Sequence, residues 1–591
     1  MTGMAEPPKD LVRTPPADFP AADSPAAGPV DPADPADILL AVFKEHLAVE
    51  QIDRDSRFYA LGGDSLIAVR VVNAARARGI PVSLRDLMVH QTVRGVIGSP
   101  AVVEALAAGG GADRSTAAET AFSLLDPADR SLVPAGVVDA LPASALQVGM
   151  LYLCETSQDP LLYHIMHGWE VCAPFDESCF RTALAELGRR HPALRTSFDL
   201  GELSEPAQLV WERAEPALSV DRAADAGKAE ALVRDWRDRR ADTPLDWQSP
   251  PLFHCQVVAL PASFHVALAA HHAILDGWSF SRLAVELMTL YHLGLGGQGV
   301  ELPGLAPDVQ RDFIAAERAT AGSAAAADHW FGQANVPALL FGAAASGRVP
   351  DPRERCETAL DPELVGALSA VARMLGVPVK SVALAAHARA LGSWTGREHD
   401  VVTGVVFNTR PESAGSDLAA GLFLNTLPIR FTTVDDTWTG LIRAAATAER
   451  EGAPYQAYPQ ARVVERLGRP AFDVTFNFMN FHAYQELDRL ASLPTRGWWR
   501  RGKPSFPFHV NVEITGTDGQ IRIGFDPAFV PRTAAEAYAD LLRQSLSALV
   551  ANPVSPAAPP GPPRPSAPSA PSAPPAPPAP PAPPAPNDRG I

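Results

Sequence analysis

The sequence predicts an α+β protein of several domains, in which a small four-helix bundle precedes a larger α/β region with two lobes. The first observation is length, because 591 residues are too many for one hydrophobic core. The second is composition, since a hydrophobic share of 47% is that of an ordinary globular protein. The third is pattern. Helical periodicity alone marks 35–104, whereas helical and strand-like segments interleave along 136–550, which favours two α/β lobes over a single sheet.

Segments of biased composition separate these units. The N-terminus is rich in Pro, Ala and Asp, a central stretch is rich in Ala and Gly, and the C-terminus is an almost pure Pro/Ala/Ser tail. Such compositions are typical of linkers and of extended chain without a core of its own. We therefore expect a disordered N-terminus, the bundle, a linker, a first lobe, a second lobe and a disordered tail at 1–34, 35–104, 105–135, 136–305, 306–550 and 551–591.

Charge and cysteine usage exclude several classes of function. The formal charge of −17, from 50 basic and 67 acidic residues, argues against a nucleic-acid partner, whose phosphates need a basic surface. The five cysteines form no C-x-x-C pair, so we expect neither a zinc site nor disulfides. The N-terminus lacks the pattern of a signal peptide, and no apolar run approaches the roughly 18 residues of a membrane helix. We expect a cytoplasmic monomer without metal or membrane partners.

The bundle contains a distinctive turn before its second helix. Apolar residues at helical spacing predict helices over Ile38–Leu47, Leu66–Ala75 and Leu84–Met88, and the window Phe58–Ser65 reads Phe-Tyr-Ala-Leu-Gly-Gly-Asp-Ser. The two glycines permit a tight turn that leaves the Ser65 hydroxyl exposed at a helix start. A phosphodiester attached there would meet the partial positive charge of the helix. The simpler interpretation is that Asp64 or Ser65 only caps the helix.

The region 136–550 is expected to contain strands and helices in alternation. A Thr-Asp-Gly sequence at 517–519 predicts a hairpin between its two flanking strands. The expected strands are Phe264–Ala269, Val401–Phe407, Phe508–Ile514 and Gln520–Phe525, and the expected helices include Phe180–Arg190, Ser279–Tyr291, Val379–Trp394 and Ala534–Leu549.

The strongest catalytic signal is the segment His271–Ser279, which reads His-His-Ala-Ile-Leu-Asp-Gly-Trp-Ser. It lies in a loop between a predicted strand and a predicted helix, a common place for catalytic side chains. His272 and Asp276 could bind a metal, but no third ligand cluster is evident. A serine hydrolase would need a nucleophile elbow of the form G-x-S-x-G, and the sequence contains none.

The turn around Ser65 resembles that of peptidyl carrier proteins. In that family the serine carries 4′-phosphopantetheine, whose thiol holds an aminoacyl or peptidyl group, so the resemblance implies that Ser65 is the attachment site. One departure is Asp64, because carriers that feed condensation domains often have His at this position. The Asp form is commoner before epimerisation domains.

The histidine segment resembles the H-H-x-x-x-D-G motif of nonribosomal peptide condensation domains, which have a chloramphenicol acetyltransferase-like fold. The likeness covers essentially all of 136–550, because further motifs of the family match in order at Leu141–Leu151, Arg190–Phe198, Gly421–Arg430 and Phe472–Phe478. It implies two similar lobes in a V, with His272 in a tunnel between them.

The resemblance also assigns roles to site residues. His272 is implied to be catalytic, either as a base or by positioning the amine, and the Gly277 N–H is placed to help the oxyanion. His271 and Asp276 are expected to be structural, because a buried carboxylate needs a partner. Arg410 is the first candidate for that partner and Arg195 is the second, although both could be ordinary surface charges.

The expected function is amide bond formation between the group on Ser65 and an acceptor amine. The expected partners are a phosphopantetheinyl transferase, an adenylation domain or upstream module in trans, and an acceptor carrier protein in trans. Three alternatives remain within the same fold: an ester-forming domain, a silent domain that recruits partner enzymes, and an epimerisation domain. The order Trp278-Ser279 counts against the last, and the intact histidine motif counts against the second. The variants at 147–151 and 425–428 look more like domains that take a D-configured donor.

Overall fold

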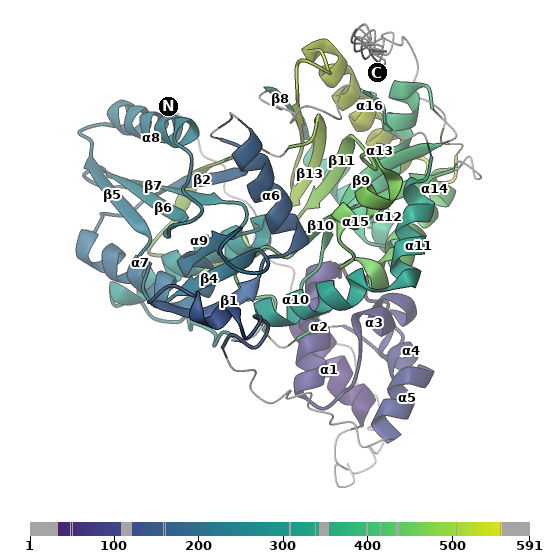
Figure 1. Cartoon of the computed structure of the whole chain (residues 1–591). Helices are drawn as coiled ribbons and strands as arrows, with labels where there is room; N and C mark the ends of the chain where they lie inside the picture. The colour runs from purple at the N-terminus through teal and green to yellow at the C-terminus, as the bar shows by residue number, and fades with distance from the viewer. Residues whose placement is uncertain are drawn as a thin grey trace, which may run out of the picture.

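The computed structural model describes residues 34–557, apart from 48, 50, 108–120, 158, 160, 307–308, 337–338, 342–353, 398–399, 414, 433–436, 481, 504 and 556. Residues 1–33 of the expected disordered N-terminus, the centre of the expected linker and most of the expected disordered tail therefore lie outside the described residues. Within the described part, an N-terminal helical bundle lies beneath a two-lobed α/β body (Figure 1). This is the α+β architecture that the sequence predicts.

The bundle has five helical segments, one more than expected. Its core is built from the apolar stripes of the first helices, including the buried Phe43 and Val72, and from Phe58 of the segment that connects α1 to α2. The additional segments are short, and Thr92 caps one of them by accepting the N–H of Gly95 at 3.0 Å. The helices are α1 Pro35–Leu47, α2 Ser65–Ala77, α3 Leu84–His90, α4 Val93–Ile97 and α5 Pro100–Ala107.

The first lobe is built on a five-stranded sheet in the order β12-β2-β7-β6-β5. Residues alternate between its two faces, and both faces are covered. Val266, Leu268 and Ala270 pack under α7 and α9, whereas Ala267 and Ala269 pack toward α8. The elements are β2 His164–Val171, α7 Glu177–Arg190, β5 Ala217–Arg222, α8 Ala226–Asp242, β6 Phe253–Ala259, β7 Phe264–His271, α9 Gly277–Gly294 and β12 Thr495–Gly502.

The second lobe is built on a six-stranded sheet in the order β10-β9-β11-β13-β14-β8. Phe508, Val510 and Val512 of β13 belong to its large hydrophobic core, whereas the alternate residues His509 and Asn511 line a cavity. The strands are β8 Glu354–Leu360, β9 Val401–Asn408, β10 Leu424–Phe431, β11 Val474–Met479, β13 Phe508–Thr515 and β14 Asp518–Phe525. The principal helices are α11 Ala324–Ala334, α12 Pro362–Leu375, α13 Val379–Thr395, α14 Trp438–Gly452, α15 Gln460–Leu467 and α16 Arg532–Ala551.

The structure differs from the expected lobe boundary in one respect. The segment 482–502 falls within the expected second lobe, yet η5 (His482–Arg489) packs against α9 and β12 pairs with β2 of the first lobe. Leu487, Leu490 and Leu493 bury their side chains in the first lobe's core. The segment crosses to the first lobe because it buries these leucines there and pairs with an edge of β2 that would otherwise be open. The crossing joins the two lobes by hydrogen bonds as well as through the chain itself.

Part of the expected linker is folded against the body. Leu125 packs with Leu203 and Leu209 of the first lobe. The buried Asp129 accepts hydrogen bonds from the backbone and hydroxyl of Ser204. These contacts lie beside a three-stranded sheet of β1 (Val137–Pro142), β4 (Ala207–Trp211) and β3 (Thr196–Asp199). The described end of the linker therefore belongs to the first lobe.

In the described part of the chain, no single helix meets the length and hydropathy of a membrane span. The pair α12 and α13 meets them jointly, with a bend of 108° between the two helices.

Candidate active site

The histidine motif lies at the C-terminal end of β7, the central strand of the first lobe's sheet. β7 ends at His271 and α9 begins at Gly277, so the motif occupies the strand-to-helix connection that the sequence predicts. The N–H of His272 donates to the carbonyl of Tyr163 at 2.7 Å. Tyr163 has a positive φ of 58°, an uncommon conformation for a residue with a Cβ. This backbone contact fixes His272 at the end of the strand.

The two histidines have different surroundings. His271 is 1% exposed, its Nδ1 accepts the N–H of Ala273 at 3.1 Å, and its Nε2 lies 3.5 Å from the Cys154 sulfur. Burial lowers the pKa of His271 to about 3, so its imidazole is neutral. His272 lines the central cavity. Its Nδ1 is buried, which leaves Nε2 as the ring nitrogen able to meet a substrate.

His272 is held in its neutral form. Burial lowers the pKa of His272 below its ordinary value, and the nearby Asp276 carboxylate acts in the opposite direction. A neutral imidazole can accept a proton or a hydrogen bond at neutral pH. His272 therefore has the protonation state that a general base requires.

Asp276 connects the motif to the second lobe. It caps α9, since its Oδ1 accepts the N–H of Ser279 at 2.6 Å. Arg410 Nη2 lies 3.2 Å from each carboxylate oxygen, and the Asp276 and Arg410 side chains are 1% and 0% exposed. The Phe423 N–H also donates to Asp276 Oδ2 at 3.1 Å. The carboxylate thus joins the histidine motif to two segments of the second lobe.

The structure brings Arg410, and not Arg195, to Asp276. The Arg195 guanidinium lies elsewhere in the first lobe, where it donates to the backbone carbonyls of Gly188 and Trp211. Arg410 also donates to the Ser279 hydroxyl at 2.7 Å. Burial lowers the pKa of Arg410, and the Asp276 charge opposes that change.

The turn before α2 has the geometry that its glycines suggest. Gly62 has a φ of 91°, and a Cβ at Gly63 would meet the ring of Phe58 at 2.4 Å. Asp64 caps α2, because its Oδ1 accepts the N–H of Ile67 at 2.8 Å. Helix α2 begins at Ser65, whose side chain lies outside the described set. Capping by Asp64 leaves Ser65 without a need to serve as the cap.

A single cavity of about 1110 Å³ adjoins both the Ser65 turn and the histidine motif. Gly62, Gly63 and Asp64 line one part of it, and His272 and Gly277 line another. The turn that precedes Ser65 and the imidazole of His272 thus line the same cavity. The glycines and the helix start at this turn fit the attachment of 4′-phosphopantetheine in the carrier domain.

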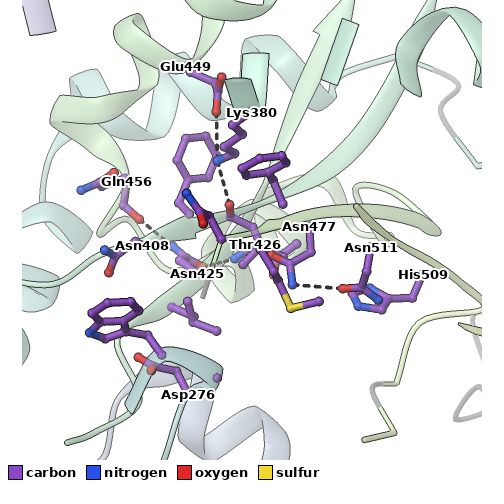
Figure 2. A pocket seen from close by; sticks show the side chains of 18 of the residues that line it. Asp276, Lys380, Asn408, Asn425, Thr426, Glu449, Gln456, Asn477, His509 and Asn511 are labelled. Atoms are coloured by element: carbon purple, nitrogen blue, oxygen red, sulfur yellow. Dashed lines mark hydrogen bonds and ion pairs between the residues drawn. The ribbon is translucent and has the colours of Figure 1, made fainter. Parts of the chain in front are cut away.

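The second lobe contributes a polar wall that the sequence did not reveal. Figure 2 shows Asp276 at one side of the cavity and the Lys380–Glu449 ion pair, at 2.9 Å, opposite it. Asn425 donates to the carbonyls of Gln456 and Tyr458 at 2.9 and 2.6 Å. Asn477 donates to Asn511 at 3.1 Å across β11 and β13. Polar residues alternate with apolar residues along β13, and this pattern indicated a polar face of the strand. The pattern does not indicate whether that face lines a cavity or meets solvent.

Within the described residues, no group of three or more His, Cys, Asp or Glu side chains is arranged to hold a metal ion. The carboxylate of Asp276, which the sequence offered as a metal ligand, is instead taken up by Arg410 and backbone donors.

Comparison with known proteins identifies both parts of the chain. The family model for a phosphopantetheine attachment site matches 37–98, and the model for a condensation domain matches 137–560. AMB antimetabolite synthetase AmbE of Pseudomonas aeruginosa is 34% identical over 532 residues, which cover 87% of this chain and 24% of AmbE. Tyrocidine synthase 3 of Brevibacillus parabrevis is 25% identical over 533 residues, which cover 85% of this chain and 8% of that synthase. The chain therefore spans a quarter or less of these relatives.

Solved structures show the same fold at low identity. The condensation domain of the Monacolin K polyketide synthase MokA superposes with a TM-score of 0.61 at 20% identity, covering 72% of this chain and all of that domain. The first condensation domain of the calcium-dependent antibiotic synthetase gives 0.59 at 19% identity, covering 71% of this chain and 98% of its own. With these matches, the chain belongs to the nonribosomal peptide synthetase family, as a phosphopantetheine-bearing carrier domain followed by a condensation domain.

Proposed function

We propose that this chain joins an acyl group carried on Ser65 to an acceptor amine presented by a second carrier, and so forms an amide bond. The observation that carries the proposal is the single cavity that the Ser65 turn shares with His272. When bound, 4′-phosphopantetheine supplies a thiol that holds the acyl group as a thioester. The cavity is lined by residues of both lobes and of the carrier domain, and binding of the thioester between these walls is expected to limit its contact with water.

His272 is the proposed base. Its neutral imidazole accepts a proton from the acceptor amine through Nε2, while the amine nitrogen bonds to the acyl carbon. The carbon–sulfur bond of the thioester then breaks, and the proton held by His272 passes to the departing sulfur, which leaves as the free thiol. Holding two reactants in register is worth up to roughly 7–11 kcal/mol, so orientation by the cavity wall is expected to contribute more than proton transfer. General base catalysis typically adds about 10²–10⁴-fold.

Gly277 is the proposed donor to the carbonyl oxygen. It is the first residue of α9 and lines the cavity. The first N–H groups of a helix have no partner within the helix and carry partial positive charge. The Gly277 N–H is therefore suited to stabilise negative charge that develops on that oxygen.

The roles of Arg410 and Asp276 are proposed to be structural. Their buried pair holds the motif loop against the second lobe, and His271 supports the same loop through its bond from the Ala273 N–H. Arg195 is proposed to have no part in the site, because its guanidinium bonds to backbone groups of the first lobe.

The direction of transfer is proposed to run from Ser65 to the acceptor. A phosphopantetheinyl transferase would modify Ser65, and an adenylation domain or upstream module would load it. The acceptor carrier is expected to act in trans. Cytoplasmic location stays a prediction.

Reconstitution with a separately loaded acceptor carrier tests the proposal. The parent chain, loaded at Ser65, should transfer its acyl group to the acceptor, and the Ser65 thioester should disappear. Product that accumulates on Ser65 would show that transfer runs from the second carrier to Ser65, opposite to the proposed direction. Binding of the acceptor carrier without product would instead favour a silent recruitment domain.

An ester-forming domain is the second candidate. The observation in its favour is similarity to the Beauvericin nonribosomal cyclodepsipeptide synthetase of Beauveria bassiana, 27% identical over 69% of this chain and 12% of that protein. Paired acceptors that differ only in an amine or a hydroxyl distinguish the two activities. The amide proposal expects the amine to react and the hydroxyl to remain.

A further inference from the structure

The carrier domain contacts the condensation domain at Asn480, at α14 and at one loop, and the loop provides its ion pairs with α2. Helix α2 meets the segment 411–421, which connects β9 to β10 and which we call the docking loop; its residue 414 lies outside the described set. Arg70 Nε contacts Asp417 at 2.9 Å, Asn73 Nδ2 contacts the Ser416 hydroxyl at 3.3 Å, and Arg76 Nη2 contacts Glu412 at 2.7 Å. Residues 70, 73 and 76 are spaced three apart and therefore share one face of the helix.

The contacts are electrostatically complementary. Two arginines of the carrier face two carboxylates of the docking loop. The Arg70 and Asp417 side chains are 21% and 13% exposed, whereas those of Arg76 and Glu412 are 38% and 33% exposed. Solvent and salt screen exposed pairs more strongly. Arg70 is therefore expected to contribute more to docking than Arg76.

Arg70 also lies beside the catalytic motif. Its guanidinium is 5.7 Å from the centre of the Trp278 ring, within the range of a cation–π contact. The Trp278 indole N–H donates to the backbone carbonyl of Asp417 at 2.9 Å. Trp278 directly follows Gly277, so one carrier side chain contacts both the docking loop and the residue next to the proposed oxyanion donor.

The opposite side of the docking loop is fastened to the catalytic centre. Arg410 Nη1 donates to the carbonyls of Ser416 and Ala419 at 2.8 and 2.7 Å. The Asp276 N–H donates to the carbonyl of Gly421 at 2.8 Å. The loop that receives the carrier is thus held by the same ion pair that holds the histidine motif.

We propose that the docking loop and Trp278 form the surface by which this condensation domain selects its donor carrier, and that Arg70 is the carrier residue that this surface recognises. The proposal rests on the function proposed above and adds the determinant of partner choice. A carrier with an acidic side chain at the position of Arg70 would place like charges against Asp417, which costs affinity. Such a carrier would be a poor donor even when correctly loaded.

The test uses the full chain, loaded at Ser65, with a separate acceptor carrier in single turnover. Arg70→Glu should slow transfer by roughly tenfold or more, whereas the matched control Lys44→Glu, an exposed residue of α1, should leave the rate unchanged. The charge swap Arg70→Glu with Asp417→Arg should restore most of the rate. Transfer by Arg70→Glu at the control rate would overturn the proposal, as would a swap that restores nothing.

Two further measurements separate this proposal from the function itself. Modification of Ser65 by the transferase should be equal in all variants, which shows that the carrier is folded. Hydrogen exchange of the docking loop should be faster in Arg70→Glu than in Lys44→Glu, because an undocked carrier no longer covers it. If the parent makes no product but exchange still differs, the proposed function fails and the docking surface stands. Equal hydrogen exchange of the docking loop in Arg70→Glu and Lys44→Glu would refute the proposed docking surface.

Discussion

Replacing Asp276 by Asn tests the structural role of the buried ion pair. Asn is as good a helix cap as Asp, so the hydrogen bond to the Ser279 N–H is retained. The negative charge is lost, and so is the oxygen that accepts from the Phe423 N–H and from Arg410. Arg410 keeps three acceptors, the Ser279 hydroxyl and the carbonyls of Ser416 and Ala419. Removing one partner of a buried pair costs about 3–5 kcal/mol. With three acceptors kept, we expect the low end, about 3 kcal/mol.

The measurement is the denaturation midpoint in guanidinium chloride, followed by tryptophan fluorescence. Asp225→Asn is the matched control, because Asp225 caps α8 through the Lys228 N–H at 2.9 Å but is exposed. The control should unfold like the parent, and Asp276→Asn should unfold at clearly lower denaturant. Equal midpoints for the two variants would refute the role assigned to the pair.

The remaining predictions concern three other residues. Ser65→Ala should gain no pantetheine mass when incubated with coenzyme A and a broad-specificity transferase, and any gain would remove the attachment site from Ser65. His272→Ala should unfold like the parent but lose roughly 10²–10⁴-fold in transfer rate, whereas an insoluble variant would mean that His272 is structural. Burial lowers the pKa of His272 below 6.5, the ordinary pKa of a histidine. The transfer rate of the parent should therefore stay constant as the pH falls through 6.5, and it should decrease only at lower pH, where the imidazole gains a proton. Burial raises the pKa of Glu317 from 4.5 to about 7. Between pH 4.5 and 7 the folded chain therefore keeps a proton on Glu317 that the unfolded chain loses. The free energy of unfolding of the parent decreases as the pH rises through this range. Glu317→Gln should therefore gain thermal stability relative to the parent between pH 4.5 and 7, and a constant difference would contradict this.

Local sequence patterns predicted the position of the histidine motif between a strand and a helix. The strand expected at Phe264–Ala269 ends at His271 in the structure, and the helix expected from Ser279 begins two residues earlier, at Gly277. Strand alternation, helical spacing and capping residues act over a few neighbours, so the sequence displays them directly. The partner of Asp276 was also expected to be an arginine, because burial of a carboxylate demands a countercharge.

Contacts between distant segments could not be predicted in this way. Nothing in the sequence of 482–502 indicates that it crosses into the first lobe, because a β-strand edge accepts any segment of suitable pattern. In the sequence, Arg70 is an ordinary polar position of an amphipathic helix, and its partner Asp417 lies 347 residues further along the chain. Their complementarity exists only once the domains have docked.

The Asp276–Arg410 pair links two properties that are usually considered separately. It stabilises the joint between the lobes, and it holds the docking loop on which the carrier rests. A weakened pair should therefore loosen both the histidine motif and the carrier surface, so Asp276→Asn is expected to reduce transfer even where the chain remains folded. The same connection constrains exchange of domains between synthetases. A foreign carrier needs a cation at the position of Arg70, and a foreign condensation domain needs its own docking loop together with its own Arg410, because a loop taken without that arginine would lose two of the hydrogen bonds that fix its shape.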